Sequence, residues 1–347
     1  MSEARDDAEI ERLLALIPRW IVSQIPATDA ASLEEIVADL GRPPCVRYRG
    51  GTGFQTLTGE VSHEDLQYVL GRVTRFRDDN RTGIERTLHR IACIRDRYHE
   101  IVGFTFRAGR TVPGAAQPIA DLLGAGGSVL VIGKPGVGKT TLLRSAADLL
   151  SGALGRRTVI ADTSNEIGGD GQIPHPAIGR ARRLQIPLPD TARPGAVEDL
   201  QARILLQAVV NHGAEAIIVD EIGFEAEARV VRTVARRGVQ LVATAHGHRL
   251  RDVVFNPDLA CLVGSPRPVV LSPEEAERRE SARHTALERT EPPTFESVVE
   301  VSQRDLLLVH TDVASSVDLI LAGLTPQVEL RRPGDPGAPS RERGGPV

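Results

Sequence analysis

The chain has 347 residues, so two or three domains are expected rather than one core. Its 41% hydrophobic and 25% charged content is typical of a folded globular protein, and the net charge of −4 excludes a global attraction to nucleic acid or to anionic membranes. Three scattered cysteines, Cys45, Cys93 and Cys261, argue against a disulfide framework or a zinc site. We find no signal peptide and no apolar run long enough to span a membrane, and we therefore expect a cytosolic protein that could dock at the periphery of a membrane complex.

Residues 1–110 are predicted to form a small α+β N-terminal domain. Helices are expected at 6–17, at 32–40 behind the capping-box pattern Ser32-Leu-Glu-Glu35, and from Ser62 to about Phe76. Strands are expected at 46–49 and 54–58, and a hairpin at 88–97 and 100–107.

Residues 111–272 are predicted to form an α/β core with a mostly parallel sheet. Continuous apolar runs predict buried strands at 129–133, 158–162, 216–221 and 240–245. Helices are expected between and after them, at 139–150, 197–211, 225–237 and about 248–255. In such a sheet, ligands bind at the carboxyl ends of the strands.

Residues 273–325 are predicted to form a short β-rich and helical C-terminal region. The segment Ser272-Pro-Glu-Glu275 has the pattern of a helix start. Strands are expected at about 285–289, 296–301 and 305–310, and a helix at 312–324. The tail, residues 326–347, is rich in Pro, Gly and Arg and is predicted to be disordered.

The most informative motif is Gly133-x4-Gly138-Lys139-Thr140, the phosphate-binding loop pattern, placed between a predicted strand and a predicted helix. Glycines allow backbone N–H groups to surround phosphate oxygens, and the helix N-terminus favours the same anion. The motif predicts ATP binding, with Lys139 on the phosphates and the Thr140 hydroxyl on Mg²⁺. The expected nucleotide-binding residues are Gly133, Lys134, Pro135, Gly136, Val137, Gly138, Lys139, Thr140 and Thr141.

Two acids end the strand at 216–221. We expect Asp220 to be a Mg²⁺ ligand and Glu221 to orient and deprotonate the attacking water. Thr244 and His246 end the next strand, where either could sense the γ-phosphate, although His246 could also be a packed corner residue. Asp162 and Glu166 follow the strand at 158–162. They are candidates for contacts with Mg²⁺ or water, and an ordinary glycine-rich connection is the alternative.

Arginines gather in two places. Arg180, Arg182 and Arg183 could act as arginine fingers toward a neighbouring subunit or line a nucleic-acid path, and the residues alone do not decide between these roles. For Arg236 and Arg237, which precede Gly238, the favourable end of a helix dipole is a sufficient explanation.

The loop at 133–141 is accompanied by Asp162-Thr-Ser-Asn-Glu-Ile-Gly-Gly-Asp-Gly171, by Ile173-Pro-His-Pro-Ala-Ile-Gly-Arg-Ala-Arg-Arg183, by Ile217-Ile-Val-Asp-Glu-Ile-Gly223 and by Ala243-Thr-Ala-His-Gly247. Together these segments resemble the ATPases related to stage III sporulation protein AA and the plastid open-reading-frame ATPases similar to it. The first-domain run from Asp78 to Ile91 resembles the same group, and the resemblance covers about residues 10–325. The most specific part is the segment 165–183.

This group is in turn similar to the type II and type IV secretion ATPases. The resemblance implies a RecA/AAA-like core in a hexameric ring, with ATP at subunit boundaries. By motif, Glu221 matches the catalytic glutamate, His246 the histidine box, and the segment 162–166 the aspartate box. Arginines of the first domain become candidates for reaching the nucleotide.

The chain departs from this pattern in two ways. The secretion ATPases usually have Gly where this chain has Asp220, so its metal handling is expected to be nearer that of an ordinary Walker B site. The C-terminal Arg-x-x-x-His domain for single-stranded nucleic acid, found in many plastid-like members, has no counterpart after Leu324.

The sequence thus predicts a Mg²⁺-dependent ATPase with catalytic candidates Glu221, His246, Thr244, Glu166, Arg180 and Arg183, and metal candidates Thr140, Asp220 and Asp162. We expect a ring-shaped homo-oligomer, most simply a hexamer, that energises protein assembly or a secretion-type process with an unidentified protein partner. A translocase that binds nucleic acid is the less favoured alternative. A module that uses ATP only as a structural switch is the competing class.

Overall fold

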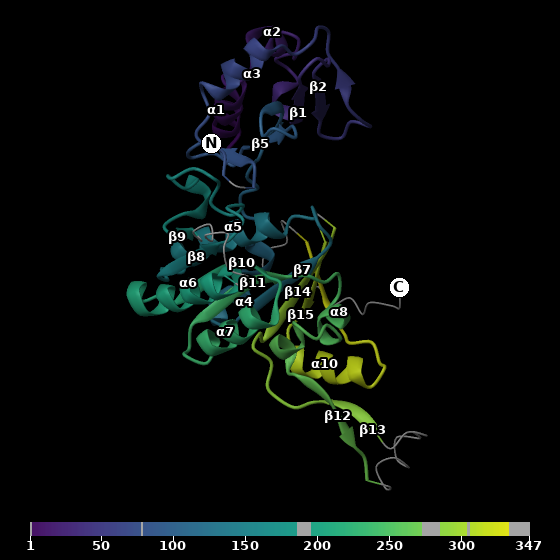
Figure 1. Ribbon diagram of the computed structural model, residues 1–347. Coiled ribbons are helices and arrows are strands. Elements are labelled where there is room, and N and C mark those ends of the chain that lie inside the picture. Colours follow the sequence, from purple (N-terminus) through teal and green to yellow (C-terminus); the bar gives the residue numbers. More distant parts are fainter. Residues whose placement is uncertain (1, 78, 186–195, 273–284, 304–305, 333–347) are drawn as a thin grey trace. The chain divides into compact units, whose positions relative to one another are not determined.

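The computed structural model describes residues 2–77, 79–185, 196–272, 285–303 and 306–332 (Figure 1). The chain divides into two compact units. Unit 1 consists of Met1–Pro113 together with Gly168–Ile178, and unit 2 consists of Gly114–Ile167 together with Gly179–Val347. The short segment Gly168–Ile178 therefore belongs to unit 1, although the sequence analysis placed it inside the core.

Unit 1 is built on a six-stranded sheet in the order β3-β2-β1-β6-β5-β4, in which all neighbouring strands are antiparallel. Its strands are β1 (Leu33–Asp39), β2 (Cys45–Tyr48), β3 (Gln55–Thr56), β4 (Arg81–Gly83), β5 (Arg90–Arg95) and β6 (Ile101–Arg107). The predicted hairpin is confirmed as β5 and β6. The two short strands predicted at 46–49 and 54–58 correspond to β2 and β3.

Three helices accompany this sheet: α1 (Ser2–Leu14), α2 (Arg19–Val22) and α3 (His63–Leu70). Apolar side chains from the helices and the sheet, among them Leu13, Ile36 and Phe104, form one buried cluster. The helix start predicted at Ser62 is confirmed and is a capping box, because the Ser62 hydroxyl accepts from the Asp65 N–H while the Asp65 carboxylate accepts from the Ser62 N–H. The helix that it starts ends at Gly71, earlier than predicted.

The helix predicted at 32–40 is wrong, because residues 33–39 form the central strand β1. The Ser32 hydroxyl donates to the Asp29 carbonyl instead of capping a helix. On the strand, Leu33, Ile36 and Ala38 are buried in the core. Glu35 forms ion pairs with arginines on both neighbouring strands, Arg47 and Arg107. Tertiary pairing has overridden a local capping pattern.

The segment Gly168–Ile178 is fixed within unit 1 by polar contacts. The Asp170 carboxylate lies 2.6 Å from the Arg77 guanidinium. The buried His175 has its Nε2 2.8 Å from Glu9 Oε1 of α1. A Cβ on Gly83 of β4 would lie only 2.3 Å from the Asp170 Cβ, so the segment packs directly on that strand.

Unit 2 is built on an eight-stranded sheet in the order β16-β15-β14-β7-β11-β10-β8-β9. Strands β14 through β9 in that order are parallel neighbours, and β15 and β16 add antiparallel pairs at one edge. The strands are β7 (Val129–Gly133), β8 (Thr158–Asp162), β9 (Arg182–Gln185), β10 (Ala216–Ile222), β11 (Gln240–Ala245), β14 (Ser297–Gln303), β15 (Leu306–His310) and β16 (Glu329–Arg331). The expected α/β fold with a mostly parallel sheet is confirmed.

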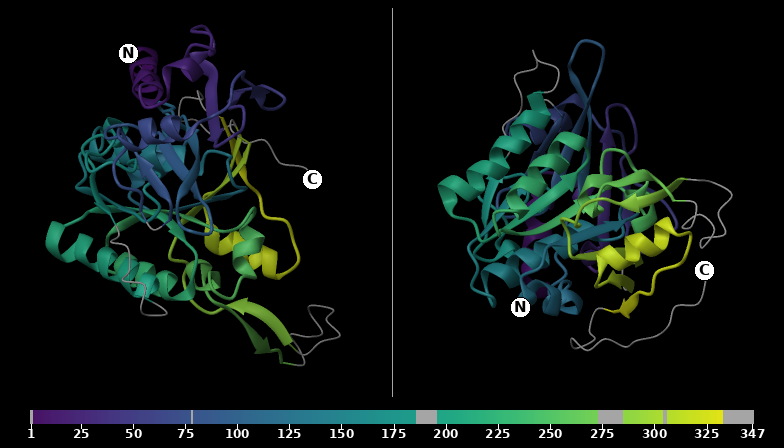
Figure 2. Two further views of the ribbon diagram at one scale, coloured as in Figure 1. Left: turned by 45° about the horizontal axis from the view of Figure 1, so that its top comes forward. Right: turned by 90° about the horizontal axis from the view of Figure 1, so that it is seen from below.

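Helices cover both faces of this sheet, as expected for strands that are apolar on both sides. The helices of unit 2 are α4 (Ala120–Ala125), α5 (Lys139–Ser151), α6 (Ala196–His212), α7 (Glu225–Ala235), α8 (Leu250–Val254) and α10 (Val313–Leu321). α6 and α7 lie side by side (Figure 2), and their apolar residues join those of α8 and α10 in one buried cluster.

Two of the strands predicted for the C-terminal region belong to the sheet of the core. The predicted strands at about 296–301 and 305–310 are present as β14 and β15, but they extend the core sheet rather than form a separate region. The tail was predicted to be disordered from residue 326, and this is wrong for β16. Arg331 of β16 is buried and forms an ion pair with Asp121. The rest of the tail, and most of the helix start at 272–275, lie outside the described residues.

A two-stranded antiparallel ribbon, β12 (Pro266–Val270) and β13 (Thr285–Arg289), completes unit 2. The strand predicted at 285–289 is confirmed as β13. Within the described parts of the chain, no helix combines the length and apolar character that a membrane span would need.

Candidate functional site

The phosphate-loop motif forms the connection between β7 and α5. Gly133, Gly136 and Gly138 all have positive φ, of 149°, 77° and 110°. A Cβ on Gly133 would also lie 2.5 Å from the Val301 carbonyl oxygen, whereas nothing lies within 4 Å of a Cβ at the other two positions. Backbone conformation therefore requires Gly136 and Gly138, and close packing against β14 adds a second requirement at Gly133.

Lys139 begins α5 and turns its side chain back into the loop. Its Nζ donates to the Gly133 carbonyl at 2.7 Å and to the Lys134 carbonyl at 3.2 Å. Burial lowers the pKa of Lys139 below its usual value, and the nearby Glu221 and Glu166 carboxylates partly oppose that shift. The ammonium is thus held at the mouth of the loop by weak acceptors that a phosphate would outcompete.

Strand order brings the predicted acids to this loop. β11 lies between β7 and β10, so the carboxyl ends of these three strands share one edge of the sheet. Asp220 of β10 is 6% exposed, and its Oδ2 accepts from the Ser164 N–H at 3.3 Å and from the Ser164 hydroxyl. Burial, with Asp162 as the next contributor, raises the pKa of Asp220 to about 7.

Glu221, the next residue, has a different environment from Asp220. Its side chain is 44% exposed, and its Oε1 lies 3.3 Å from Nδ1 of His246, which is 72% exposed. The Thr244 hydroxyl instead donates to the Asp220 carbonyl within the sheet. The structure therefore brings Glu221 and His246 together at a solvent-accessible edge and gives Thr244 a hydrogen bond between β10 and β11.

Asp162 and Glu166 lie in the turn that follows β8. Asp162 is fully buried, and its Oδ1 accepts from the Ile167 N–H at 3.2 Å. The turn is also held by Arg144 of α5, whose guanidinium donates to the Glu166 carbonyl at 2.5 Å and to the Ile167 carbonyl at 2.7 Å.

The sequence analysis missed Arg144 and Ser164. An arginine within the apolar pattern of 142–150 was the available signal for Arg144, because a buried guanidinium needs partners. The hydroxyl at Ser164, two residues after Asp162, carried no signal without the strand order.

The acids fit a divalent cation that arrives with its phosphate ligands. Among the residues that the structure describes, no three His, Cys, Asp or Glu side chains are grouped as a self-sufficient metal site. Mg²⁺ is usually held by one or two carboxylates plus substrate phosphates and water, so a full protein cage is not required. Burial, and after it the charge of Asp162, raise the pKa of Asp220, and a cation held beside the two carboxyl groups would oppose both effects.

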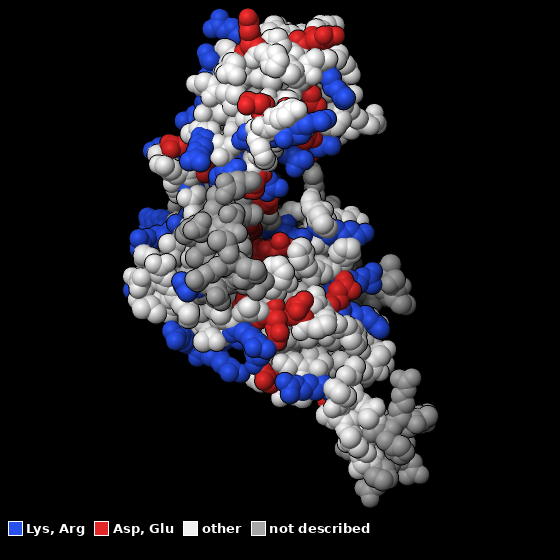
Figure 3. All heavy atoms as spheres, viewed as in Figure 1, with Lys and Arg blue, Asp and Glu red and all other residues white. Residues whose placement is uncertain are grey.

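Arg180 and Arg183 lie elsewhere on unit 2. Arg183 pairs in register with Ile160 of β8, while Asp162 pairs with Gln185. The Arg180 backbone N–H donates to the Ser151 hydroxyl at the end of α5, the end opposite the loop. The register thus places Arg183 two residue pairs before the carboxyl edge of the sheet at which Asp162 lies, and the Arg180 backbone lies at the end of α5 that is far from the loop. Figure 3 shows basic side chains gathered over α7, which carries Arg229 and Arg232 and is followed by Arg236 and Arg237.

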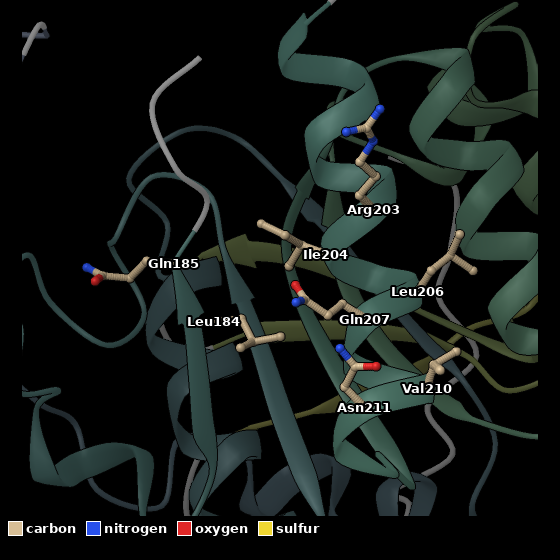
Figure 4. Close-up of a pocket in the computed structure, with 8 residues that line it drawn as sticks. All are labelled: Leu184, Gln185, Arg203, Ile204, Leu206, Gln207, Val210 and Asn211. Carbon is tan, nitrogen blue, oxygen red and sulfur yellow. The ribbon is translucent and has the colours of Figure 1, made fainter. Parts of the chain in front are cut away.

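A hollow of about 490 Å³ lies between β9 and α6, away from the loop (Figure 4). Leu184 points toward Ile204 and Gln207, whereas Gln185 points away. The hollow is lined by Leu184, Gln185, Arg203, Ile204, Leu206, Gln207, Val210 and Asn211. This lining holds one cation and no carboxylate, so it does not match the acid-rich edge described above.

The chain has clear relatives among known proteins. It is 45% identical over 330 residues to the uncharacterized protein ycf45 of Porphyra purpurea, and 45% identical over 325 residues to the protein SEEDLING PLASTID DEVELOPMENT 1 of Arabidopsis thaliana. These alignments cover 95% and 93% of this chain but 56% and 46% of the relatives, so the chain spans about half the length of each. No family model matches the chain.

Another ycf45 protein, from Cyanidium caldarium, is 35% identical over 325 residues, which cover 93% of both chains. Stage III sporulation protein AA of Bacillus subtilis is 26% identical over 275 residues, which cover 72% of this chain and 85% of that protein. The expected relationship to both groups is confirmed. The chain belongs to the ycf45 family and is homologous to the sporulation protein.

Two solved structures show weaker likeness. The Legionella pneumophila ATPase DotB is 16% identical, with a TM-score of 0.49, and the match covers 84% of this chain and 75% of that one. The pilus retraction motor PilT is 16% identical, with a TM-score of 0.45, and the match covers 75% of this chain and 79% of that one.

Proposed function

We propose that this member of the ycf45 family binds ATP with Mg²⁺ in the loop between β7 and α5 and hydrolyses it to ADP and phosphate. One observation carries the proposal. Lys139 lies in a glycine loop of the required backbone conformation, and the electrostatic fields of Glu221 and Glu166 both reach its ammonium. A nucleoside triphosphate would supply an anion for the loop. The acids beside it would bind the metal ion and activate the attacking water.

The chain's own groups have distinct roles in this proposal. Lys139 exchanges its two carbonyl acceptors for phosphate oxygens, and the backbone N–H groups of residues 134–141 surround the same anion. Asp220, Asp162 and the Thr140 hydroxyl would hold Mg²⁺, which supplies charge neutralisation on the phosphates. Mg²⁺ beside Asp220 would lower the pKa of this carboxyl group, so Asp220 would then be ionised.

Glu221 is the proposed general base. It is exposed enough to meet a water molecule, and His246 beside it is placed to orient the carboxylate or to sense the γ-phosphate. We expect Glu221→Gln to retain ATP while turnover falls by about a hundredfold or more. Steady-state phosphate release and filter retention of labelled ATP measure the two effects. An unchanged rate in Glu221→Gln would remove Glu221 from the role of base.

The same assay separates hydrolysis from a switch that uses ATP only for structure. Repeated turnover under excess ATP supports the enzyme. A single turnover that stops with bound ADP would support the switch. Glu225→Gln is the matched control, because this exposed glutamate on α7 pairs with Arg229 four residues away.

We further propose a ring-shaped homo-oligomer, with the hexamer as the simplest form. In this proposal Arg180 and Arg183, whose backbones are not at the edge of the sheet that holds the loop, or Arg81, Arg97 or Arg107 of unit 1, act on a neighbour's nucleotide. Light scattering of Glu221→Gln with saturating ATP tests assembly, and a strict monomer at micromolar protein refutes it. An Arg183→Ala subunit mixed with Lys139→Ala subunits should regain hydrolysis only if the arginine acts across a boundary.

The proposed process is the assembly or secretion of protein partners, and we place it at the cytosolic periphery of a membrane complex. Homology to a sporulation protein supports this class without naming the partner. The arginines over α7 and at 180–183 favour the alternative, a translocase on single-stranded nucleic acid. ATPase rates with single-stranded DNA and RNA at two salt concentrations distinguish them, because phosphate contacts weaken steeply with salt. Stimulation that is lost at high salt and in the triple Ala variant of Arg180, Arg182 and Arg183 would favour the translocase.

A further inference from the structure

The loop that carries His246 is held at both of its ends. It joins β11 to α8, and the Gly247 carbonyl accepts from the Gly133 N–H of the phosphate loop at 2.8 Å. Gly247 has a φ of 155°, which an L side chain rarely adopts, so this turn has one defined backbone path. The direction of His246 toward Glu221 therefore depends on where the turn enters α8.

The entry to α8 rests on a buried carboxylate. Glu300 of β14 is 7% exposed, and its Oε1 accepts from the Leu250 N–H at 2.6 Å. β14 is the parallel neighbour of β7, with Glu300 in register with Ile132, one residue before Gly133. Glu300 thus lies beside the strand that carries the phosphate loop and contacts the turn that carries His246.

Two further side chains hold Glu300 in place. His310 of β15 has its Nε2 3.2 Å from Glu300 Oε1, and its Nδ1 lies 3.1 Å from the Ser316 hydroxyl of α10. Ser, His and Glu in this order also occur in hydrolases. All three are at least nine-tenths buried here, so no substrate reaches Ser316 and the set cannot work as a nucleophile.

Burying a carboxylate is costly. Glu300 is nevertheless buried on β14, the strand whose Val298 belongs to the apolar core of unit 2. An apolar residue at position 300 would stabilise the packed core more than a carboxylate does. Glu300, His310 and Ser316 instead form a polar chain that ends in one hydrogen bond, from the Leu250 N–H at the start of α8 to Glu300.

We propose that Glu300, supported by His310 and Ser316, is a positioning residue that fixes the turn from His246 to Leu250 and so keeps His246 against Glu221. This inference rests on the proposed ATPase function. Glu300 does not touch the nucleotide in this account; it acts through Leu250 and the turn.

The test compares Glu300→Leu, which removes the acceptor of the Leu250 N–H, with the parent chain in two measurements. Steady-state kinetics should show kcat reduced by about tenfold to a hundredfold, while the affinity for ATP, measured with ADP and with non-hydrolysable ATP, changes by less than about threefold. Hydrogen exchange without nucleotide should become faster at the amides of residues 247–252. Ser316→Ala should show a smaller change of the same kind, because it reaches Glu300 only through His310.

Glu296→Leu is the matched control. Its Oε2 accepts from the Ser128 N–H at 2.5 Å, so it joins β14 to the opposite end of β7, far along the strand from the turn. It should lower the melting temperature without changing kcat or exchange at 247–252.

The outcomes separate the two proposals. Equal losses of kcat in Glu300→Leu and Glu296→Leu, in proportion to lost stability, would overturn the positioning role. Unchanged kcat and unchanged exchange in Glu300→Leu would overturn it as well. If the parent chain hydrolyses no ATP, the proposed function fails and with it the catalytic role, while the exchange comparison still decides whether Glu300 holds the turn.

Discussion

The two ends of the core sheet treat charge in opposite ways. At the carboxyl ends of the strands, Asp162 and Asp220 are buried beside each other, and Asp220 is held largely protonated below pH 7. At the amino ends, Arg157 pairs with the Glu215 carboxylate at 3.1 Å, and Arg156 donates to Gln240 Oε1 at 2.8 Å. One end keeps like charges together, and the other gives each charge an ordinary partner.

The comparison shows that the carboxyl ends of the strands are the place where the arrangement of charges lowers the free energy of unfolding. Two neighbouring buried carboxylates oppose each other and lose hydration, which a chain selected for stability alone would avoid. Such conflict is typical of a site that expects a ligand of opposite charge. The amino end needs no ligand, because its polar groups are satisfied within the chain.

The largest expected effect is at Lys139. Lys139→Ala should lower ATP affinity at least about a hundredfold, or about 3 kcal/mol, because the loop loses its point charge toward the phosphates. Titration of a fluorescent ATP analogue measures the change. Arg229→Ala is the control, because this exposed cation on α7 pairs with Glu225. The two lysines of the chain, Lys134 and Lys139, both lie in the loop, so lysine labelling reports on the loop once the N-terminal amine is accounted for, and ATP should protect Lys139 in the parent. Parent-like affinity in Lys139→Ala would contradict the nucleotide site.

The next effect concerns stability against pH in the presence of a chelator. The pKa of Asp220 is about 7 in the folded chain against 3.8 as the ordinary value, so the folded state binds more protons between these pH values. The free energy of unfolding therefore falls as pH rises from about 4 to about 7, by up to about 4 kcal/mol. Asp220→Asn should remove this dependence and be more stable than the parent at pH 8 but not at pH 4.

Urea denaturation at the two pH values measures this gap. The exposed Asp258 is the control position, and Asp258→Asn should follow the parent. A parent whose stability does not fall between pH 4 and pH 7, relative to Asp220→Asn, would show that the acids are not in conflict.

A smaller loss is expected from Gln240 at the amino end. Gln240 is 3% exposed, and its Nε2 donates to the Leu123 and Gly127 carbonyls at 3.0 Å and 2.9 Å. Gln240→Ala leaves these acceptors without their donor and should cost about 1–3 kcal/mol of unfolding free energy, with kcat unchanged. The exposed Gln207→Ala on α6 should be neutral in the same denaturation experiment. A fall in kcat greater than the loss of folded protein would mean that this end also serves the reaction.

The smallest effect is expected for Arg157→Ala. Its side chain is 69% exposed and that of Glu215 is 49% exposed, so water and salt screen the pair. Melting temperature and ATPase rate should both be indistinguishable from the parent. A clear loss of either would show that the amino end is more than a satisfied surface.

The sequence predicted the core better than unit 1, for physical reasons. Strands such as β8 and β11 are buried on both faces, so their apolar runs needed no knowledge of neighbours. β1 was misread because Ser32 and Glu35 imitate a cap, and only the pairing of Glu35 with Arg47 and Arg107 shows its place in a sheet.

For the candidate site, local spacing was enough to single out the loop glycines, Lys139, Glu221 and His246, and the roles assigned to them stay predictions. Ser164 beside Asp220 and Glu300 beside Leu250 are contacts between distant segments, which no local pattern reveals. The assignment of Gly168–Ile178 to unit 1 is of the same kind.

Because the segment Gly168–Ile178 belongs to unit 1, a single cleavage of the chain does not separate the two units. The chain passes from one unit to the other after Pro113, after Ile167 and after Ile178. A protease that cleaves after Pro113 would leave a first fragment without the piece that supplies Asp170 to Arg77 and His175 to Glu9. Those fragments should remain together through this piece, as in a split protein reassembled by a shared element. A stand-alone unit 1 for expression would need residues 168–178 joined back to it through a designed linker.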